Sequence, residues 1–318
     1  MYYLQYGLVL FLLMLAYVYI AKRFNIVDTP NIRSSHERVV VRGAGVVFPL
    51  SLIVFNVTFS QYYPNFHFVF AGAMLISLIS FIDDIKPLPV WGRLPIHLLA
   101  VFLLLYGFDI LFLWKWWTIS VFVFVMLGII NAYNFMDGIN GITALYSLVA
   151  FSSLWYVSKY VEFTDATAFV NYGIVSCLVF LFFNFRKNAI CFLGDVGSIG
   201  LGFWIVAAIS YVVFWNYNFE YLLFIAVYLV DAGFTLIQRL LNGENISEPH
   251  RKHLYQMLVN ECGYGHLKIA LWYSAVQLGV NAFVVFTDFP FMLTGFFVLV
   301  PLMMAYMSFK RAIVTRKQ

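Results

Sequence analysis

The sequence predicts an all-α polytopic membrane protein of about eleven transmembrane helices, with its N-terminus outside and its C-terminus in the cytoplasm. Of its 318 residues, 63% are hydrophobic and 11% are charged, and the mean hydropathy is +0.87. This composition is typical of proteins that cross the bilayer several times. The chain also repeats apolar stretches near the ~20 residues that one crossing requires, and its basic residues gather in alternate loops between them.

Eleven apolar stretches are predicted to cross the membrane. They are residues 3–20, 43–60, 67–82, 95–113, 116–136, 141–158, 166–184, 197–215, 219–238, 267–286 and 289–309. The fourth is interrupted by Gly107 and Asp109. The first is not expected to be a cleaved signal peptide, because no basic residue precedes it and no small-residue cleavage site follows it. We interpret residues 1–318 as one integral membrane domain.

The basic residues predict the orientation. Eleven spans put the termini on opposite sides, and of the 19 Lys and Arg residues only Lys115 and Lys159 then lie on the side of the N-terminus. The positive-inside rule therefore places the other basic residues and the C-terminus in the cytoplasm. The net charge of +4 belongs to loops that face anionic lipid or substrate, and it does not indicate a nucleic-acid partner. The three cysteines lack metal-binding spacing, and their odd number argues against a disulfide framework.

The stretch Asn131–Gly141 is a polar, glycine-rich turn between two apolar runs. Polar groups are costly at such a place in lipid, so we expect them to line a wet surface or a site. Asn131 and Asn134 are three residues apart and share a face of a helix. The glycines that follow are expected to end the helix and to free Asp137. Amide and carboxylate oxygens suit a hard cation or a sugar nucleotide; an ordinary polar loop is the alternative.

The first cytoplasmic loop, about residues 22–45, carries three arginines and ends in a glycine-rich segment. Arg33, like Arg38 and Arg42 later in the same loop, is a candidate ligand for phosphate. A plain positive-inside loop is the alternative. Gly43 and Gly45 allow the backbone to approach another segment closely as the chain re-enters the membrane.

The second cytoplasmic loop begins with Asp83-Asp84, directly after an apolar run. Two adjacent carboxylates are costly at a membrane boundary unless a cation or water is present. They are therefore candidate catalytic acids, and a solvated acidic helix end is the alternative.

The fourth cytoplasmic loop ends in Gly194-Asp195-Val196-Gly197-Ser198, which begins an apolar span. This pattern predicts a helix N-terminus with bare backbone N–H groups that suit phosphate. Asp195 is expected either to cap that helix or to bind a cation that the phosphate shares. Many ordinary helix starts have the same pattern, so the motif alone is weak.

The last polar groups lie in the ninth span and in the fifth cytoplasmic loop. Asp231 is placed well within its span, where it serves either a site or a polar partner on a neighbouring helix. His250 and His253 are three residues apart, which predicts one helical face. Two imidazoles without a third ligand make a poor zinc site. With Arg251 between them they make a better cradle for a diphosphate.

All these polar groups are predicted on the cytoplasmic side, whereas a transporter is expected to place polar residues near the bilayer midplane. This layout suits an enzyme that joins a cytosolic polar substrate to a lipid. The motifs, in order over nearly the whole chain, resemble the polyprenyl-phosphate N-acetylhexosamine-1-phosphate transferases. That family includes the phospho-MurNAc-pentapeptide translocase. The His-Arg-Lys-His-Leu-Tyr-Gln segment that begins at His250 is more similar to the O-antigen-initiating branch.

The resemblance implies that undecaprenyl phosphate and a UDP-N-acetylhexosamine give undecaprenyl-diphospho-sugar and UMP, with Mg²⁺ or Mn²⁺, at an inner (plasma) membrane site that faces the cytoplasm. The roles that we assign on this basis fall into three groups. Asp83, Asp84 and Asp137 are the catalytic candidates; Arg33, Asn184, Phe192, Asp231, His250, Arg251 and His253 bind substrate; Asp195, Asn131 and Asn134 hold the metal. Asn184 and Phe192 of the substrate group, together with Asp137 of the catalytic group, are expected to contact the uridine end of the donor.

The alternative is a polytopic lipid or ion carrier without transferase activity. Direct attack by the lipid phosphate and a phospho-enzyme route both stay open. The identity of the sugar and of the polymer is open as well, and a homodimer is expected from the resemblance alone.

Overall fold

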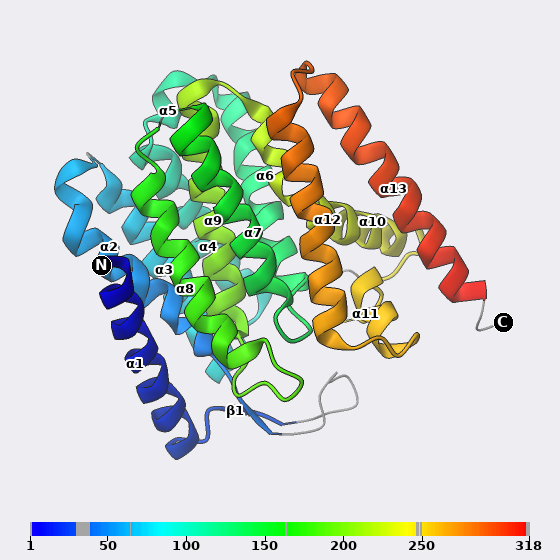
Figure 1. Cartoon of the computed structure of the whole chain (residues 1–318), viewed down its shortest axis with the longest axis horizontal. Coiled ribbons are helices and arrows are strands. Elements are labelled where there is room, and N and C mark those ends of the chain that lie inside the picture. Colours follow the sequence, from blue (N-terminus) through cyan, green and yellow to red (C-terminus); the bar gives the residue numbers. More distant parts are fainter. Residues whose placement is uncertain are drawn as a thin grey trace.

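The computed structural model describes residues 2–29, 39–63, 65–162, 164–245, 248 and 250–315. In these ranges the chain is almost entirely helical (Figure 1). The first half contains α1 (Tyr2–Arg23), β1 (Val27–Asp28), β2 (Val40–Val41), α2 (Val47–Phe59), α3 (Phe66–Ile85), α4 (Val90–Gly107), α5 (Ile110–Leu113), α6 (Trp116–Phe135) and α7 (Ile142–Tyr156). The second half contains α8 (Thr167–Asn184), α9 (Gly194–Asn216), α10 (Ala226–Leu241), α11 (Leu254–Asn260), α12 (His266–Phe286) and α13 (Phe291–Thr315).

Helix α9 is the centre of the bundle. It packs against α3, α6 and α7, and 94% of its most apolar window is buried. A helix that is apolar on all sides is expected in such a position. Helix α13 is the opposite case, since 17% of its window is buried, and it lies at the edge of the bundle (Figure 1).

Each predicted apolar stretch falls on a helix. Within the described ranges, nine helices are long and apolar enough to cross a membrane. The stretches 43–60 and 141–158 correspond to the shorter helices α2 and α7, of 13 and 15 residues. The prediction of an all-α polytopic membrane protein is therefore confirmed, while the count of eleven crossings and the orientation stay predictions.

The structure differs from the sequence-based expectation in three segments. The first loop forms a short antiparallel ribbon in which Val27 pairs with Val41. The fourth helix begins at Val90, before Pro95, and ends at Gly107, where Asp109 adopts a left-handed conformation with φ of 57°. The fifth loop contains α11, a short helix that the apolar pattern did not reveal because its buried side chains face only one way.

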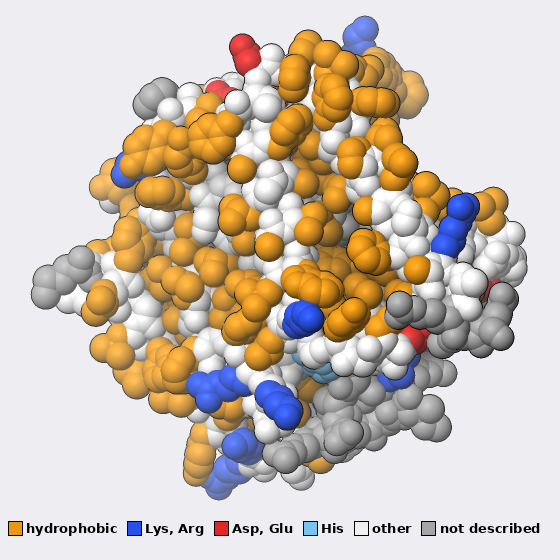
Figure 2. All heavy atoms as spheres, turned by 45° about the vertical axis from the view of Figure 1, so that its right-hand side comes forward, with side chains coloured by type: hydrophobic (Ala, Val, Ile, Leu, Met, Phe, Trp, Pro, Cys, Tyr) orange, Lys and Arg blue, Asp and Glu red, His pale blue; other side chains and the backbone are white. Residues whose placement is uncertain are grey.

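The surface agrees with a membrane environment. In Figure 2 apolar side chains cover most of the visible face, and Lys and Arg side chains lie mainly toward its lower end. Helices α1 and α8 also end toward the lower side in Figure 1, where β1 and the start of α12 lie. Loops that are far apart in the sequence are thus gathered at one end of the bundle.

The close approach predicted for the first loop is confirmed at Gly45. A Cβ atom at this residue would lie 2.1 Å from the Cα atom of Gly197 in α9. The backbone N–H of Gly45 also donates to the carbonyl oxygen of Leu193 at 2.9 Å. Two glycines in contact therefore let the end of the first loop lie directly on the start of α9.

We expect Gly45→Ala to destabilise the protein by about 1–3 kcal/mol or more, because the added methyl group meets backbone that cannot move aside. The measurement is the melting temperature of the purified protein in detergent. Gly128→Ala is the matched control, since nothing lies within 4 Å of a Cβ atom there and alanine favours a helix. Equal melting temperatures for the two variants would contradict the packing described.

Candidate active site

Hydrogen bonds join the five predicted cytoplasmic loops to one another. The N–H of Phe192 donates to the carbonyl oxygen of Val41 at 2.7 Å, which ties the fourth loop to the first. The third loop is tied to the fourth by Asn184, which accepts from the N–H of Gly141 at 2.6 Å. The hydroxyl of Tyr255 in the fifth loop donates to the carbonyl oxygen of Phe135 at 3.1 Å. These bonds hold the first, third, fourth and fifth loops together, and Asp84 of the second loop joins them through the contacts described next.

Asp84 caps the N-terminus of α9. Its carboxylate accepts the N–H of Asp195 at 2.9 Å and that of Val196 at 3.0 Å, and Arg42 donates to it at 2.9 Å. Gly194, with φ of 72°, leaves room for this carboxylate, which would lie 2.5 Å from a Cβ atom there. Two of the N–H groups that we expected to face phosphate are therefore bonded to Asp84.

Asp83 and Asp195 lie side by side at the ends of α3 and α9. The same atom of Arg93, Nη1, pairs with Oδ2 of Asp83 and, at 3.2 Å, with Oδ2 of Asp195. The other oxygen of Asp83 accepts the N–H of Leu88 at 2.5 Å. The Asp195 side chain keeps 22% of its surface exposed, against 9% for Asp83, so Asp195 is the more open of the two carboxylates.

The two asparagines of α6 have different partners. Asn134 donates to Oδ1 of Asp195 at 3.0 Å and to the hydroxyl of Ser198 at 3.1 Å. Asn131 donates to the carbonyl oxygen of Leu127 in its own helix at 2.7 Å. The structure therefore brings Asn134 to Asp195 and turns the amide nitrogen of Asn131 away; a metal role for either residue stays a prediction.

Asp137 is a half-buried acid in the turn between α6 and α7. The hydroxyl of Thr143 donates to its Oδ1 at 2.7 Å. Burial raises the pKa of Asp137 to about 7, and the neighbouring carboxylates of Asp195 and Asp84 act in the same direction. An acid that titrates near neutral pH is a candidate for functional proton or cation exchange.

Asp231 holds the start of α11. Its carboxylate accepts the N–H of Leu254 at 2.9 Å, that of Tyr255 at 3.3 Å and the hydroxyl of Tyr273 at 2.7 Å. These partners are all protein groups, so Asp231 is placed to position His253, the residue before α11. Substrate binding by Asp231 stays a prediction.

The basic segment before α11 is extended, which corrects the expectation that His250 and His253 share a helical face. The two rings nevertheless lie 4.8 Å apart. Burial lowers the pKa of His250 to about 4, so this imidazole is neutral near pH 7. Nε and Nη2 of Arg251 are buried without a hydrogen-bond partner in the described part of the chain. These donors are available to an anion.

Three further predicted residues have the following places. Asn184 is buried and also donates to the carbonyl oxygen of Cys191 at 2.8 Å, so both ends of its amide connect loops. Phe192 is half-buried beside Cys191. Arg33 lies outside the described residues.

Arg93 is the main residue that sequence reasoning missed. It lies ten residues after Asp83, on the next helix, and no local motif marks it. The available signal was the cost of two acids at a membrane boundary, which demands a cation nearby. Thr143 and Ser198 were also missed, because hydroxyl residues are common in helices and carry no pattern of their own.

Residues 66–214 match the family model described as glycosyl transferase family 4. The match covers a little under half of the chain. The family 4 region contains Asp83, Asp84, Asp137 and Asp195, whereas the basic segment before α11 lies outside the match.

Curated relatives extend the likeness. A Bacillus subtilis protein described as a probable undecaprenyl-phosphate N-acetylglucosaminyl 1-phosphate transferase is 27% identical over 258 residues, 76% of this chain and 71% of that protein. A phospho-N-acetylmuramoyl-pentapeptide-transferase of Listeria monocytogenes is 31% identical over 123 residues, 39% of this chain and 37% of that protein. The same enzyme of Caldicellulosiruptor bescii is 26% identical over 179 residues, half of this chain and 56% of that protein.

The family 4 match and these transferase relatives make the chain a phosphosugar transferase enzyme. This result excludes the carrier alternative that the sequence left open. The chain spans less than two thirds of the two pentapeptide-transferases, so their acceptor and donor are not transferred to it by likeness alone.

We expect the protein to lose stability as the pH rises, because of Asp137. In the unfolded chain this carboxyl loses its proton near the ordinary pKa of 3.8, whereas the folded protein retains the proton up to about pH 7. The stabilising contribution is complete below about pH 4 and is lost as the pH rises through about 7. Asp137→Asn removes this titration, so its melting temperature should decrease less than that of the wild type between about pH 5 and pH 8.

The measurement is thermal unfolding of both proteins in the presence of a chelator. Asp288→Asn is the control, since Asp288 is exposed on the loop before α13 and its variant should follow the wild type. A parallel pH dependence for Asp137→Asn and wild type would contradict the raised pKa.

Proposed function

We propose that the protein transfers N-acetylhexosamine-1-phosphate from a UDP-sugar to undecaprenyl phosphate, which gives undecaprenyl-diphospho-sugar and UMP. The product would initiate a cell-surface glycan such as an O-antigen. The names of the relatives support this reaction class and acceptor. The structural observation that carries the proposal is the Asp83–Arg93–Asp195 contact, which holds two carboxylates together at the gathered loop end of the bundle.

The charge of this cluster supports a divalent cation. Among the described residues, four carboxylates gather with two guanidinium groups; the acids are Asp83, Asp84, Asp137 and Asp195, and the bases are Arg42 and Arg93. Full ionisation would leave an excess of two negative charges, which one Mg²⁺ or Mn²⁺ would balance. The raised pKa of Asp137 fits such an excess.

The donor set also suits Mg²⁺. No group of three or more His, Cys, Asp or Glu side chains in the described ranges forms a complete metal site. Mg²⁺ is, however, usually bound by one or two carboxylates, with water and substrate phosphate completing its shell. Asp195 would supply a carboxylate, with Asn134 beside it. When bound, the cation would neutralise charge that develops on the diphosphate.

The remaining work falls to side chains of the chain itself. Arg93 would exchange one of its carboxylates for a phosphate oxygen and so orient the acceptor, since a guanidinium binds phosphate as readily as carboxylate. Asp83, which is bonded to fewer protein groups than Asp84, is the better placed of the two to accept a proton from the lipid phosphate. This demand is modest, because the second pKa of a phosphate monoester is about 6.

Arg251 and His253 would hold the diphosphate of the donor. The ring of His253 stacks on Phe135, with the ring centroids 6.2 Å apart, and Phe135 follows Asn134 directly. His253 therefore contacts the residue that follows Asn134, which donates to Asp195. We propose that the site faces the cytoplasm of the inner membrane, where the nucleotide sugar is soluble and the lipid phosphate arrives from the bilayer.

Asp195→Asn should abolish transfer of labelled sugar-phosphate to undecaprenyl phosphate while leaving the folded protein intact, because asparagine is a poorer metal ligand of the same shape. Asp83→Asn should reduce transfer as well, because an amide cannot accept the proton of the lipid phosphate. The assay uses purified protein, Mg²⁺ and a panel of UDP-N-acetyl-sugars, with lipid-linked product and UMP as readouts. Asp288→Asn is the folded control.

Two results would count against the proposal. Full transfer by Asp195→Asn would reject its metal role. A wild-type protein that forms no lipid-linked product and no UMP with any donor of the panel would reject the proposed substrates.

Arg251→Gln should reduce kcat/KM for the nucleotide sugar about 10- to 150-fold, because a hydrogen bond to a charged group contributes about 1.5–3 kcal/mol. Arg186→Gln is the matched control, because the Arg186 guanidinium lies over the ring of Phe182 at 4.6 Å and donates to its carbonyl oxygen. The measurement is steady-state kinetics at saturating acceptor. Equal losses in the two variants would indicate that Arg251 does not contact the donor.

A further inference from the structure

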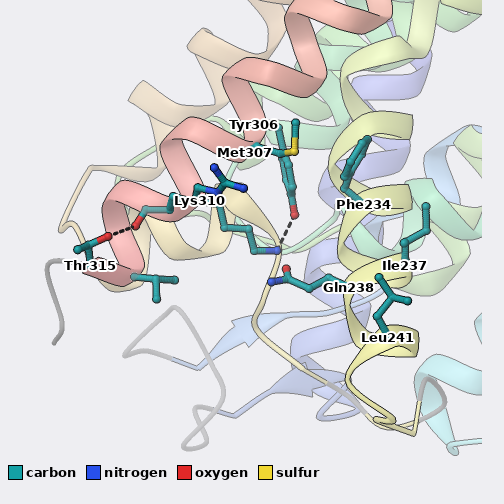
Figure 3. Close-up of a pocket in the computed structure, with 10 residues that line it drawn as sticks. Phe234, Ile237, Gln238, Leu241, Tyr306, Met307, Lys310 and Thr315 are labelled. Atoms are coloured by element: carbon teal, nitrogen blue, oxygen red, sulfur yellow. Dashed lines mark hydrogen bonds between the residues drawn. The ribbon is translucent and has the colours of Figure 1, made fainter.

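A groove separates α10 from α13 at their C-terminal ends (Figure 3). Its volume is about 530 Å³. Apolar side chains form its walls, and they are open to the surroundings: Ile237 is 52% exposed, Leu241 83% and Val314 47%. Helix α13 and the segment Phe219–Leu241, which ends in α10, are long and apolar enough to cross a membrane, so these walls face the bilayer near its boundary with water.

A buried cation lies at the base of the groove. Lys310 is 8% exposed and extends from α13 toward α10, where its ammonium group meets the hydroxyl of Tyr306 (Figure 3). Its second contact is the hydroxyl of Thr235, at 3.4 Å. An ammonium group has three donors, so one of them is left without a partner in the described part of the chain.

In the described part of the chain Lys310 has no direct ion pair, and Asp231 and Glu244 attract it only from a longer distance. In the described ranges no carboxylate lies within 4.0 Å of its ammonium group, and both of its partners are neutral hydroxyls. Arg311, which follows, is exposed and lines the same groove. A buried charge without a counter-ion is costly, and two neighbouring cations at the end of an apolar groove favour an anionic occupant.

We propose that this groove binds an anionic membrane phospholipid, with Lys310 and Arg311 holding the headgroup phosphate and the apolar walls holding the first part of an acyl chain. Basic pockets between transmembrane helices on the cytoplasmic side suit such headgroups. None of the residues that line the groove belongs to the Asp83–Arg93–Asp195 cluster, where we place the acceptor phosphate.

The same residues connect the groove to the candidate active site. The hydroxyl of Thr235 contacts both Tyr306, at 2.8 Å, and Oδ1 of Asp231, at 3.4 Å. Asp231 in turn holds the first N–H groups of α11. A headgroup that binds Lys310 would therefore stabilise the network that positions His253, and this second step rests on the proposed function.

Binding is tested on the purified full chain in neutral detergent, titrated with phosphatidylglycerol or with phosphatidylcholine of the same acyl chains. Native mass spectrometry and melting temperature are the readouts. Phosphatidylglycerol should bind and stabilise, and phosphatidylcholine should not. Lys310→Met and Arg311→Gln should each weaken binding about fivefold, and together about 30-fold, because one basic group near an anionic surface contributes about such a factor.

The double variant Lys22→Met with Arg23→Gln, at the exposed end of α1, is the control and should bind as the wild type does. If Lys310→Met does not fold, Arg311→Gln carries the test, since Arg311 is exposed. Equal binding of both lipids, unchanged binding by the groove variants, or displacement of phosphatidylglycerol by undecaprenyl phosphate would each overturn the site.

Transfer activity in vesicles of the two lipids then tests the connection to α11. Higher kcat in phosphatidylglycerol that disappears in Arg311→Gln would support it. Phosphatidylglycerol binding with lipid-independent kcat would overturn the connection alone. Phosphatidylglycerol binding without transfer in any lipid would overturn the proposed function and leave the lipid site standing.

Discussion

The carboxylate of Asp84 is the contact on which the arrangement of the loops depends. It accepts two N–H groups at the start of α9 and a guanidinium from the first loop, so one side chain connects three segments. A carboxylate at a helix N-terminus also interacts favourably with the helix dipole. Because α9 is the most buried helix of the bundle, a group that fixes its first turn also fixes where Asp195 lies.

The low dielectric of the membrane explains why the polar groups of this protein form continuous sets. The amide of Gln277 in α12 accepts from the hydroxyl of Tyr146 and donates to Asn281, which donates to Ser153 in α7 at 2.8 Å. Each of these buried donors has an acceptor, on a neighbouring helix or one turn along the same helix, as lipid surroundings require. The cluster around Asp195 differs, since its acids are close together and outnumber its bases, and this excess of negative charge is the reason we propose a cation there.

Much of the fold was predictable, because a span is a local property: about twenty apolar residues predict a helix wherever they occur. The convergence of Asp83, Asn134 and Asp195 was also predictable, since they follow or precede spans on one side. The contacts of each acid were not predictable, because the adjacent residues Asp83 and Asp84 have the same chemistry in the sequence. They differ only through their partners in the fold: Asp83 contacts Leu88 and Arg93, whereas Asp84 contacts Arg42 and the start of α9. The ribbon of the first loop and the short helix α11 depend on tertiary contacts in the same way.

The structure uses one arrangement twice. Asp84, at the end of α3, caps α9 beside Asp195; Asp231, within α10, caps α11 beside His253. In both cases a buried acid from one helix fixes the first turn of another, and a residue to which we assign a metal or substrate role lies at that turn. Asparagine at either capping position would retain the shape but weaken bonds that depend on the negative charge. The acids that a sequence motif marks most clearly therefore divide into two kinds, those that build the site and those, such as Asp195, that face it.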